Sequence, residues 1–267
     1  MNILRKFASF VKLRRRLAKI LNMIDTIKYS VLSNRGYRSH AYVTIHPKSS
    51  HFPVLLRPAT SDIQVFHQIF IEEEYAPLKN LKNIDYIIDC GANIGLSSAY
   101  LLSQFPKASL IAIEPAKTNL SMLEKNLAPY GDRAEIICGA IWPESVPLEI
   151  NKHPYRDGQE WSFTVTPKTS EDNQTIRGIA IKDILEPLDP CAKILMKIDI
   201  EGTETLLFQS DLSWLKTIHA IAIELHEDSP FGPCKDLFNK AIDKTEFELT
   251  TSGELILGTK PSFSSVR

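Results

Sequence analysis

The chain has 267 residues, of which 43% are hydrophobic and 24% are charged, and its formal net charge is −1. This composition is ordinary for a soluble globular protein, and the length suits one large α/β domain with an extension. The near-zero charge argues against a general nucleic-acid-binding protein, and the four widely separated cysteines argue against a zinc site or a disulfide framework.

The first element that we expect is a helix over residues 3–29, in which basic residues alternate with an apolar stripe at helical spacing. The simplest interpretation is a helix packed on the rest of the protein. A second interpretation is contact of residues 1–28 with an anionic membrane surface. Since no apolar run is long enough to span a bilayer and no signal-peptide pattern is present, we expect a cytoplasmic protein, with peripheral contact at the inner face of the membrane as an option.

The next segments predict two short strands, at residues 42–45 and 54–57, and then a helix over residues 62–74. Asp62 is the expected cap of this helix. Its expected inner face consists of Ile63, Phe66, Ile69 and Phe70. From residue 85 onward, apolar strands alternate with amphipathic helices, which indicates a mainly parallel sheet. We therefore divide the chain into an N-terminal extension, 1–80, and a main domain, 81–267.

The strands of the main domain are expected at residues 86–90, 110–114, 135–139, 193–199 and 218–225. Helices are expected at residues 96–105, 117–127, 203–210 and 235–244. Residues 147–150 and 162–166 are two further candidate strands in a less regular region. A hairpin formed by residues 247–251 and 254–257 around Ser252-Gly253 ends the predicted fold.

The strongest functional pattern is Asp89-Cys90-Gly91-Ala92-Asn93-Ile94-Gly95, which places an acid and a glycine-rich turn between a strand and a helix. Glu114 ends the next strand, 23 positions after Gly91, near the spacing at which an acid binds a ribose. The turn lacks the G-x-G-x-x-G pattern of NAD enzymes. Two acids at strand ends, Asp89 and Glu114, suit S-adenosylmethionine, because this cofactor is cationic, has a ribose and has no phosphate.

A second pattern, Asp199-Ile200-Glu201-Gly202-Thr203-Glu204, follows the fourth predicted strand. Because ligands bind at the carboxyl ends of parallel strands, Asp89, Glu114 and Asp199 should converge on one cleft. Glu224 and His226 end the fifth strand and point to the same side of an extended chain. They are candidates for a base or for metal ligands, whereas Glu204 is readily explained by its place at a helix start.

These residues resemble the FkbM-type S-adenosylmethionine-dependent methyltransferases over about residues 54–227. The resemblance also rests on Pro53–Asp62 and Glu73-Glu74-Tyr75. It implies a class I methyltransferase fold, a Rossmann-like sheet of seven mostly parallel strands with the last one antiparallel, here with an N-terminal helical and β extension. It implies that Asp89, Gly91, Asn93 and Gly95 line the methionine and ribose end of the cofactor, that Glu114 holds the ribose and that the segment around Ala140 lies near the adenine.

The function expected from this resemblance is O-methylation of a hydroxyl on a sugar, a glycan or a small natural product. Asp199, Glu201 and His226 are the candidate catalytic residues, and Asp199 and Glu224 are candidate ligands for Mg²⁺. The alternatives are an NAD-dependent oxidoreductase and a non-catalytic S-adenosylmethionine-binding module. A nucleic-acid methyltransferase would carry an Asn/Asp-Pro-Pro-aromatic motif where Asp199–Gly202 stands, so nucleic acid is not the expected partner. The acceptor and the oligomeric state stay open.

Overall fold

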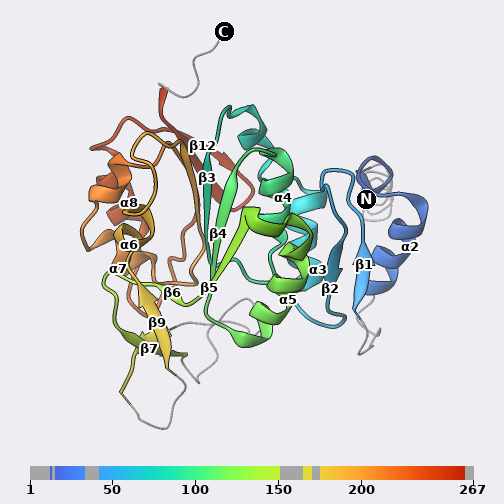
Figure 1. Ribbon diagram of the computed structural model, residues 1–267, viewed down its shortest axis with the longest axis horizontal. Helices are drawn as coiled ribbons and strands as arrows, with labels where there is room; N and C mark the ends of the chain where they lie inside the picture. Colours follow the sequence, from blue (N-terminus) through green and yellow to red (C-terminus); the bar gives the residue numbers. More distant parts are fainter. Residues whose placement is uncertain (1–12, 14–15, 34–41, 151–164, 170–174, 262–267) are drawn as a thin grey trace, which may run out of the picture.

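The computed structural model describes residues 13, 16–33, 42–150, 165–169 and 175–261. Its centre is a seven-stranded sheet in the order β12-β13-β11-β10-β3-β4-β5 (Figure 1). These strands are β3 (Tyr86–Cys90), β4 (Ser109–Glu114), β5 (Ala134–Cys138), β10 (Ile194–Ile198), β11 (Ala220–Glu224), β12 (Glu248–Ser252) and β13 (Leu255–Thr259). The last strand, β13, runs antiparallel to both of its neighbours, while the other pairs are parallel. The expected seven-stranded class I methyltransferase sheet is confirmed.

Helices cover both faces of this sheet (Figure 1). One face carries α4 (Leu96–Gln104) and α5 (Lys117–Leu127), and the other carries α6 (Ile181–Leu185), α7 (Glu204–Phe208) and α8 (Lys235–Ile242). Each face has its own hydrophobic cluster, because the central strands are apolar on both sides and need two covering layers. The chain crosses from each parallel strand to the next through a helix, so the carboxyl ends of β3, β4, β10 and β11 meet at one edge.

The N-terminal extension packs against the face covered by α4 and α5. It begins with α2 (Met23–Leu32) and the two-stranded antiparallel sheet of β1 (Val43–Ile45) and β2 (Val54–Leu56). Helix α3 (Asp62–Phe66) follows and continues as a π-helical turn over His67–Ile71. A 3₁₀ helix over Ala76–Asn80 ends the extension. Its buried side chains, such as Ile45 and Phe66, belong to the same hydrophobic cluster as Tyr100 of α4 and Leu123 of α5.

Two predictions for this extension are wrong. The helix expected over residues 3–29 is interrupted at residues 21–22, where Asn22 accepts a hydrogen bond from the backbone N–H of Asp25 and begins α2. Residues 1–12 and 14–15 lie outside the described chain. Asp62 does not cap the next helix through its side chain. It is fully buried and pairs with Arg57, whose backbone N–H it also binds.

A second, four-stranded sheet lies beside the main one in the order β6-β9-β7-β8. Its strands are β6 (Ala140–Ile141), β7 (Pro147–Ile150), β8 (Val165–Pro167) and β9 (Ile176–Ile179). Strand β7 has the predicted bounds, but β6, β9 and helix α6 were not expected. The remaining short helices are 3₁₀ turns at Ala128–Arg133 and Ser213–Lys216. Within the described residues, no helix is long and apolar enough to cross a membrane.

Candidate active site

A cavity of about 610 Å³ opens at the carboxyl ends of the parallel strands. Its size is typical of a site for a small molecule or cofactor. Among the described residues that line it, Lys197 alone is cationic, whereas six are acidic. The acidic lining residues are Glu74, Glu114, Asp199, Glu201, Glu224 and Glu254. The cavity is therefore suited to a cationic ligand rather than to one that carries phosphates.

Glu114 ends β4 and reaches the cavity with its carboxylate held from the protein side. Its Oε1 accepts hydrogen bonds from the backbone N–H of Ala116 at 2.9 Å and from the Asn119 amide at 3.3 Å, and its Oε2 accepts one from the backbone N–H of Asn93 at 2.9 Å. Burial raises the pKa of Glu114 to about 7, although these hydrogen bonds act to lower it. The carboxylate is fixed in orientation and keeps acceptor capacity for a diol.

The two glycines of the turn after β3 are required by contacts within the protein. A Cβ on Gly91 would lie 1.8 Å from the backbone carbonyl oxygen of Asp199, and the φ of Gly91 is +81°. Gly95 has a φ of +84°, and a Cβ there would lie 2.7 Å from the Leu123 side chain on α5. We expected both glycines to line the methionine and ribose end of the cofactor. Gly91 does line the cavity, but the tight approaches in the structure are to the β10 exit and to α5.

Asp89 lies beneath the cavity floor and is fully buried. Its Oδ2 accepts hydrogen bonds from the hydroxyls of Ser97 at 2.7 Å and Ser98 at 2.6 Å, and its Oδ1 lies 3.3 Å from the Lys197 ammonium. Asp89 is not part of the cavity lining, whereas Ser97 and Lys197 are. Any influence of Asp89 on a bound ligand therefore passes through these two side chains.

Lys197 connects the floor of the cavity to its acidic wall. This buried residue of β10 donates a hydrogen bond to the Gly91 carbonyl at 2.6 Å and lies 3.3 Å from carboxylate oxygens of Asp89 and Asp199. Burial lowers its pKa, but the two carboxylates outweigh this effect and hold the pKa well above the usual value. Sequence reasoning missed Lys197, although a lysine inside the apolar strand Ile194–Ile198 was a visible signal.

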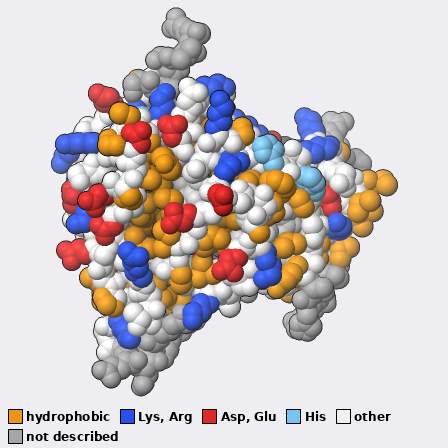
Figure 2. Space-filling view, in the orientation of Figure 1, with side chains coloured by type: hydrophobic (Ala, Val, Ile, Leu, Met, Phe, Trp, Pro, Cys, Tyr) orange, Lys and Arg blue, Asp and Glu red, His pale blue; other side chains and the backbone are white. Residues whose placement is uncertain are grey.

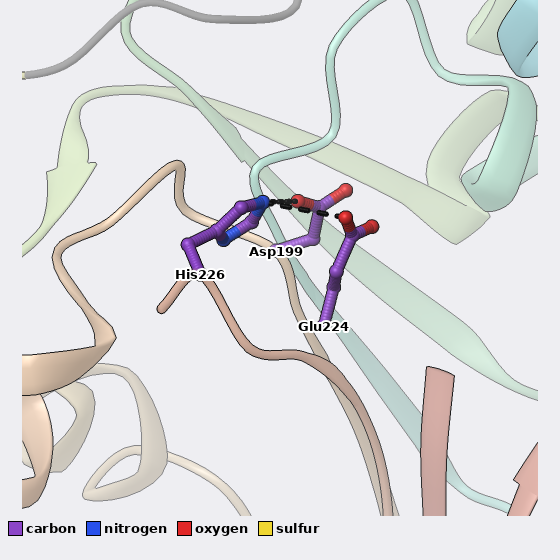
Figure 3. A group of neighbouring side chains, drawn as sticks. All are labelled: Asp199, Glu224 and His226. Carbon is purple, nitrogen blue, oxygen red and sulfur yellow. Dashed lines mark ion pairs between the residues drawn. The ribbon is translucent and has the colours of Figure 1, made fainter. Parts of the chain in front are cut away.

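The acidic wall is formed by residues from the ends of β10 and β11. Asp199 and Glu201 follow β10, Glu224 ends β11, and His226 lies two positions further on. Figure 3 shows the His226 ring with one nitrogen facing the carboxylates of Asp199 and Glu224. The His226 Nε2 lies 3.4 Å from Glu224 Oε1, 3.8 Å from Glu201 Oε2 and 3.9 Å from Asp199 Oδ1. The structure thus places the three candidate catalytic residues, Asp199, Glu201 and His226, beside Glu224.

Glu204 fixes the orientation of His226. Its side chain is fully buried at the start of α7, and its Oε1 lies 2.8 Å from His226 Nδ1 and accepts a hydrogen bond from the backbone N–H of Ile200. Burial lowers the pKa of His226, but the neighbouring carboxylates, Glu204 first, raise it to about 11. The carboxylates around His226 therefore favour a positive charge at this position. We interpreted Glu204 as a helix-start acid, and this second role was missed.

Two other acids of the cavity are hard to ionise. Burial raises the pKa of Glu74 to about 7, and its acidic neighbours, Glu254 first and Glu224 next, add to this effect. Burial and the charge of Asp199 likewise raise the pKa of Glu224, against the opposing effect of His226. Negative charge is thus crowded on this side of the cavity, which would favour a cation placed between these groups.

The expected site residues fall into three groups. Gly91, Asn93, Glu114 and Ala140 line one part of the cavity, and Asp199, Glu201 and Glu224 line another. Asp89, Gly95 and His226 stand behind the lining and support it.

Comparisons with known proteins show the family of this chain. Residues 89–251, more than half of the chain, match the family described as the methyltransferase FkbM domain. The chain is 39% identical over 199 residues to methyltransferase sdnD of Sordaria araneosa, covering 63% of this chain and 76% of that protein. It is 25% identical over 175 residues to methyltransferase 1 of Beauveria bassiana, covering 57% of this chain and 69% of that protein.

Among solved structures, the precorrin-6Y C5,15-methyltransferase of Geobacter metallireducens matches with a TM-score of 0.40 at 12% identity, over 71% of this chain and 88% of that chain.

Proposed function

This chain belongs to the methyltransferase FkbM domain family and is an S-adenosylmethionine-dependent methyltransferase, and we propose that its acceptor is a hydroxyl oxygen on a sugar, a glycan or a small natural product. The observation that carries this proposal is the wall of carboxylates formed by Asp199, Glu201 and Glu224 beside the cavity. A hydroxyl becomes a good nucleophile only as it loses its proton, and a carboxylate at hydrogen-bonding distance can take that proton.

The cavity has the donor and acceptor groups that this cofactor requires. The methyl donor carries a sulfonium, an ammonium and a ribose diol but no phosphate, and the lining is rich in carboxylates. We assign the ribose to Glu114, whose carboxylate is held by Asn93, Ala116 and Asn119 and can accept hydrogen bonds from both hydroxyls. The adenine then lies toward Ala140 at the exit of β5.

The protein contributes alignment more than chemistry. When bound, the cofactor supplies a methyl group on a positively charged sulfur, which is reactive without further activation. Gly91 and Asn93 support the part of the cofactor that leads to this sulfur, and Lys197 fixes Asp199 relative to them. Asp199 and Glu201 line the same cavity as these residues and would hold an acceptor near the bound cofactor. Asp199 holds and activates the hydroxyl, and Glu201 takes its proton.

Two alternative functions are distinguished by ligand binding and turnover. An NAD-dependent oxidoreductase would bind a dinucleotide, which needs donors for its pyrophosphate where this cavity presents acids. A non-catalytic module would bind S-adenosylmethionine and transfer nothing. Family membership favours the methyltransferase over both.

The experiment that tests the proposal is a methyl-transfer assay with isotopically labelled S-adenosylmethionine over extracted glycans and small hydroxylated metabolites. The expected result is the gain of one labelled methyl group on an oxygen, located by mass spectrometry and NMR of the product. Transfer to nitrogen or carbon would overturn the assignment of a hydroxyl acceptor. Cofactor binding without transfer to any acceptor would favour the non-catalytic module.

A further inference from the structure

The imidazole of His226 is held so that only one nitrogen faces the cavity wall. His226 is 1% exposed, and Nδ1 faces the buried carboxylate of Glu204 at 2.8 Å. Glu204 is itself tied to the backbone N–H of Ile200 at 3.1 Å. A carboxylate that binds one ring nitrogen of a histidine is the usual arrangement behind a histidine that ligates a metal with the other.

The distances around His226 Nε2 are too long for hydrogen bonds; the distance to Glu224 matches the separation of two ligands on one ion, and Asp199 would move closer when an ion binds. Nε2 lies 3.4 Å from Glu224 and 3.9 Å from Asp199, beyond the usual range of about 2.7–3.2 Å for N–H···O bonds. Ligand atoms that each lie about 2.1 Å from one ion are separated by about 3.0–3.5 Å. Figure 3 shows one ring nitrogen of His226 and the carboxylates of Asp199 and Glu224 facing one another.

Asp199 supplies an independent observation. Its Oδ1 is buried, accepts no hydrogen bond and points toward the His226 ring, while Oδ2 lies 3.3 Å from the Lys197 ammonium. One ligand atom from each of Asp199, Glu224 and His226 lies within 4.8 Å of the others. The three residues come from the ends of two neighbouring strands and the loop after the second.

We propose that Asp199, Glu224 and His226 bind one divalent transition-metal ion and that the acceptor hydroxyl completes its coordination. This inference rests on the proposed function, because it names how that acceptor is held. Two carboxylates with an imidazole suit Mn²⁺ better than Mg²⁺, which prefers oxygen ligands alone. The ion lowers the pKa of the bound hydroxyl, whose proton passes to Glu201; the new C–O bond forms as the S–C bond breaks, and the electron pair stays on sulfur.

The test uses the full chain, stripped of metal with a chelator and titrated with Mn²⁺. Electron paramagnetic resonance measures free and bound Mn²⁺, and spin-echo modulation detects a directly coordinated ¹⁴N nucleus. We expect one site per chain with ¹⁴N modulation. In His226→Gln the modulation disappears and the affinity falls at least about tenfold. The matched control His51→Gln removes an exposed histidine and should change neither readout.

A second pair of variants keeps the proposal falsifiable if His226→Gln does not fold. Glu224→Gln should weaken Mn²⁺ binding at least about tenfold, whereas Glu248→Gln, an exposed glutamate of β12, should leave it unchanged. Absence of stoichiometric Mn²⁺ binding to the wild-type chain would overturn the proposal, and so would ¹⁴N modulation that persists in His226→Gln. In either case the role of His226 would be that of a protonated imidazole that balances the negative charge of the neighbouring carboxylates.

Failure of the metal site can be told apart from failure of the proposed function. If the chelated protein binds S-adenosylhomocysteine and methylates a hydroxyl at the wild-type rate, the metal proposal is wrong and the function stands. If the protein binds Mn²⁺ but neither form binds S-adenosylhomocysteine, the proposed function is wrong.

An independent observation concerns the outward face of α2. Four large apolar side chains of this helix, Met23, Ile24, Ile27 and Val31, are 79%, 64%, 59% and 41% exposed. Figure 2 shows hydrophobic side chains gathered at the end of the molecule where α2 lies in Figure 1. At 100° per residue these four positions fall on one stripe, and Asp25, Tyr29 and Leu32 on the opposite side are buried.

The charge of the surrounding sequence identifies the partner. The first 40 residues contain ten of the 31 lysines and arginines but only Asp25 of the 32 acids. We infer that the apolar stripe of α2 inserts into an anionic lipid surface, with the basic segment attracted to the headgroups. Apolar insertion and several basic residues together provide the two signals that stable peripheral binding requires.

Vesicle sedimentation of the full chain tests this inference. Binding should occur with vesicles of phosphatidylcholine plus phosphatidylserine, weaken with salt, and fall about tenfold or more in the double variant Ile24→Ser/Ile27→Ser. Leu249→Ser, which changes an exposed leucine of β12, is the control. Wild-type binding by the double variant would overturn the inference. A dimer in light scattering that the double variant disrupts, without vesicle binding, would assign the stripe to a second copy instead.

Discussion

Single carboxylates at the ends of neighbouring strands differ in what surrounds them, and this difference sets their roles. Asp89 has two hydroxyl donors and a buried ammonium, so its charge is satisfied within the protein. Asp199 shares that ammonium, but its side chain is 29% exposed and lines the cavity, whereas the side chain of Asp89 is fully buried beneath it. The same residue type at equivalent strand ends is therefore structural in one case and chemically available in the other.

The first prediction concerns Asp199. Asp199→Asn preserves the shape of the side chain but removes its charge, so the acceptor hydroxyl is no longer activated. We expect the turnover number to fall about 10²–10⁴-fold, while affinity for S-adenosylhomocysteine survives. Steady-state kinetics and titration calorimetry measure the two effects. The exposed Glu248→Gln variant should retain full turnover. Wild-type turnover by Asp199→Asn would remove this residue from the mechanism.

The second prediction concerns Glu114. Glu114→Ala should weaken binding of S-adenosylhomocysteine by about 1.5–3 kcal/mol, because hydrogen bonds between the ribose and a charged group are lost. Glu135→Ala on the neighbouring strand removes an exposed carboxylate and should leave the affinity unchanged. Equal affinities of the two variants in titration calorimetry would contradict the ribose assignment.

The third prediction follows from the pKa of Glu114, which burial raises to about 7. The ribose hydroxyls donate to the ionised form, so cofactor affinity should increase as the pH rises through about 7. Between the ordinary pKa and this value, the folded protein holds a proton that the unfolded chain has lost. The contribution of Glu114 to the free energy of unfolding therefore decreases as pH rises across that window.

Glu114→Gln isolates both effects, because it removes the titration and keeps the size of the side chain. Calorimetric titrations measure the affinity for S-adenosylhomocysteine, and urea unfolding measures the free energy of unfolding, both from pH 5 to pH 8. The difference between wild type and variant in each quantity should change with pH around the pKa of Glu114. A pH-independent difference would show that Glu114 does not titrate in this range.

At the scale of elements, Arg57 joins the N-terminal extension to the cofactor-binding face. Its guanidinium binds the fully buried Asp62 at the start of α3 and the Asn119 amide on α5. Asn119 in turn donates to Glu114. The turn between β2 and α3 is therefore part of the support behind the proposed ribose acid, and the extension shares one hydrophobic cluster with α4 and α5.

The fourth prediction is that Arg57→Met destabilises the protein by about 3–5 kcal/mol, because it leaves the Asp62 carboxylate buried without its partner. Chemical denaturation measures this change. Arg177→Met, which changes an exposed arginine of β9, should alter stability by less than about 0.5 kcal/mol. If both variants unfold at the same denaturant concentration, Asp62 does not depend on Arg57 for its burial.

The elements that sequence predicted well are those with strong local patterns. The bounds of β3 and α5 agree with the prediction, because an unbroken apolar strand and an amphipathic helix each carry their own signal. Strand β9 was missed because it is short, includes Arg177 and Gly178, and is defined by pairing with the distant strands β6 and β7. The break at Asn22 was missed because apolar spacing continues across it.

At the scale of the molecule, the strand ends that the sequence assigned to one cleft do meet there. The alternation of strands and helices in the sequence predicts a parallel sheet, and parallel strands place their carboxyl ends at one edge. What could not be predicted was orientation. Three contacts join segments that no local pattern relates. They are the close approach of the Asp199 carbonyl to Gly91, the position of the Lys197 ammonium between two strands, and the hydrogen bond between Glu204 and His226.

The cavity at the strand ends is also lined by Ile69 of the N-terminal extension and by Val165 of the second sheet, so a ligand that fills it contacts all three parts of the molecule. A ligand that binds only the folded state stabilises it by about 2.7 kcal/mol at 100 times its dissociation constant. For a chain of this size, that corresponds to an increase of about 5–10 °C in Tm. S-adenosylhomocysteine should produce this shift in calorimetry, and Glu114→Ala should reduce it. NAD⁺ at the same concentration should produce none, because acids occupy the positions where a pyrophosphate needs donors; a shift with NAD⁺ alone would favour the oxidoreductase.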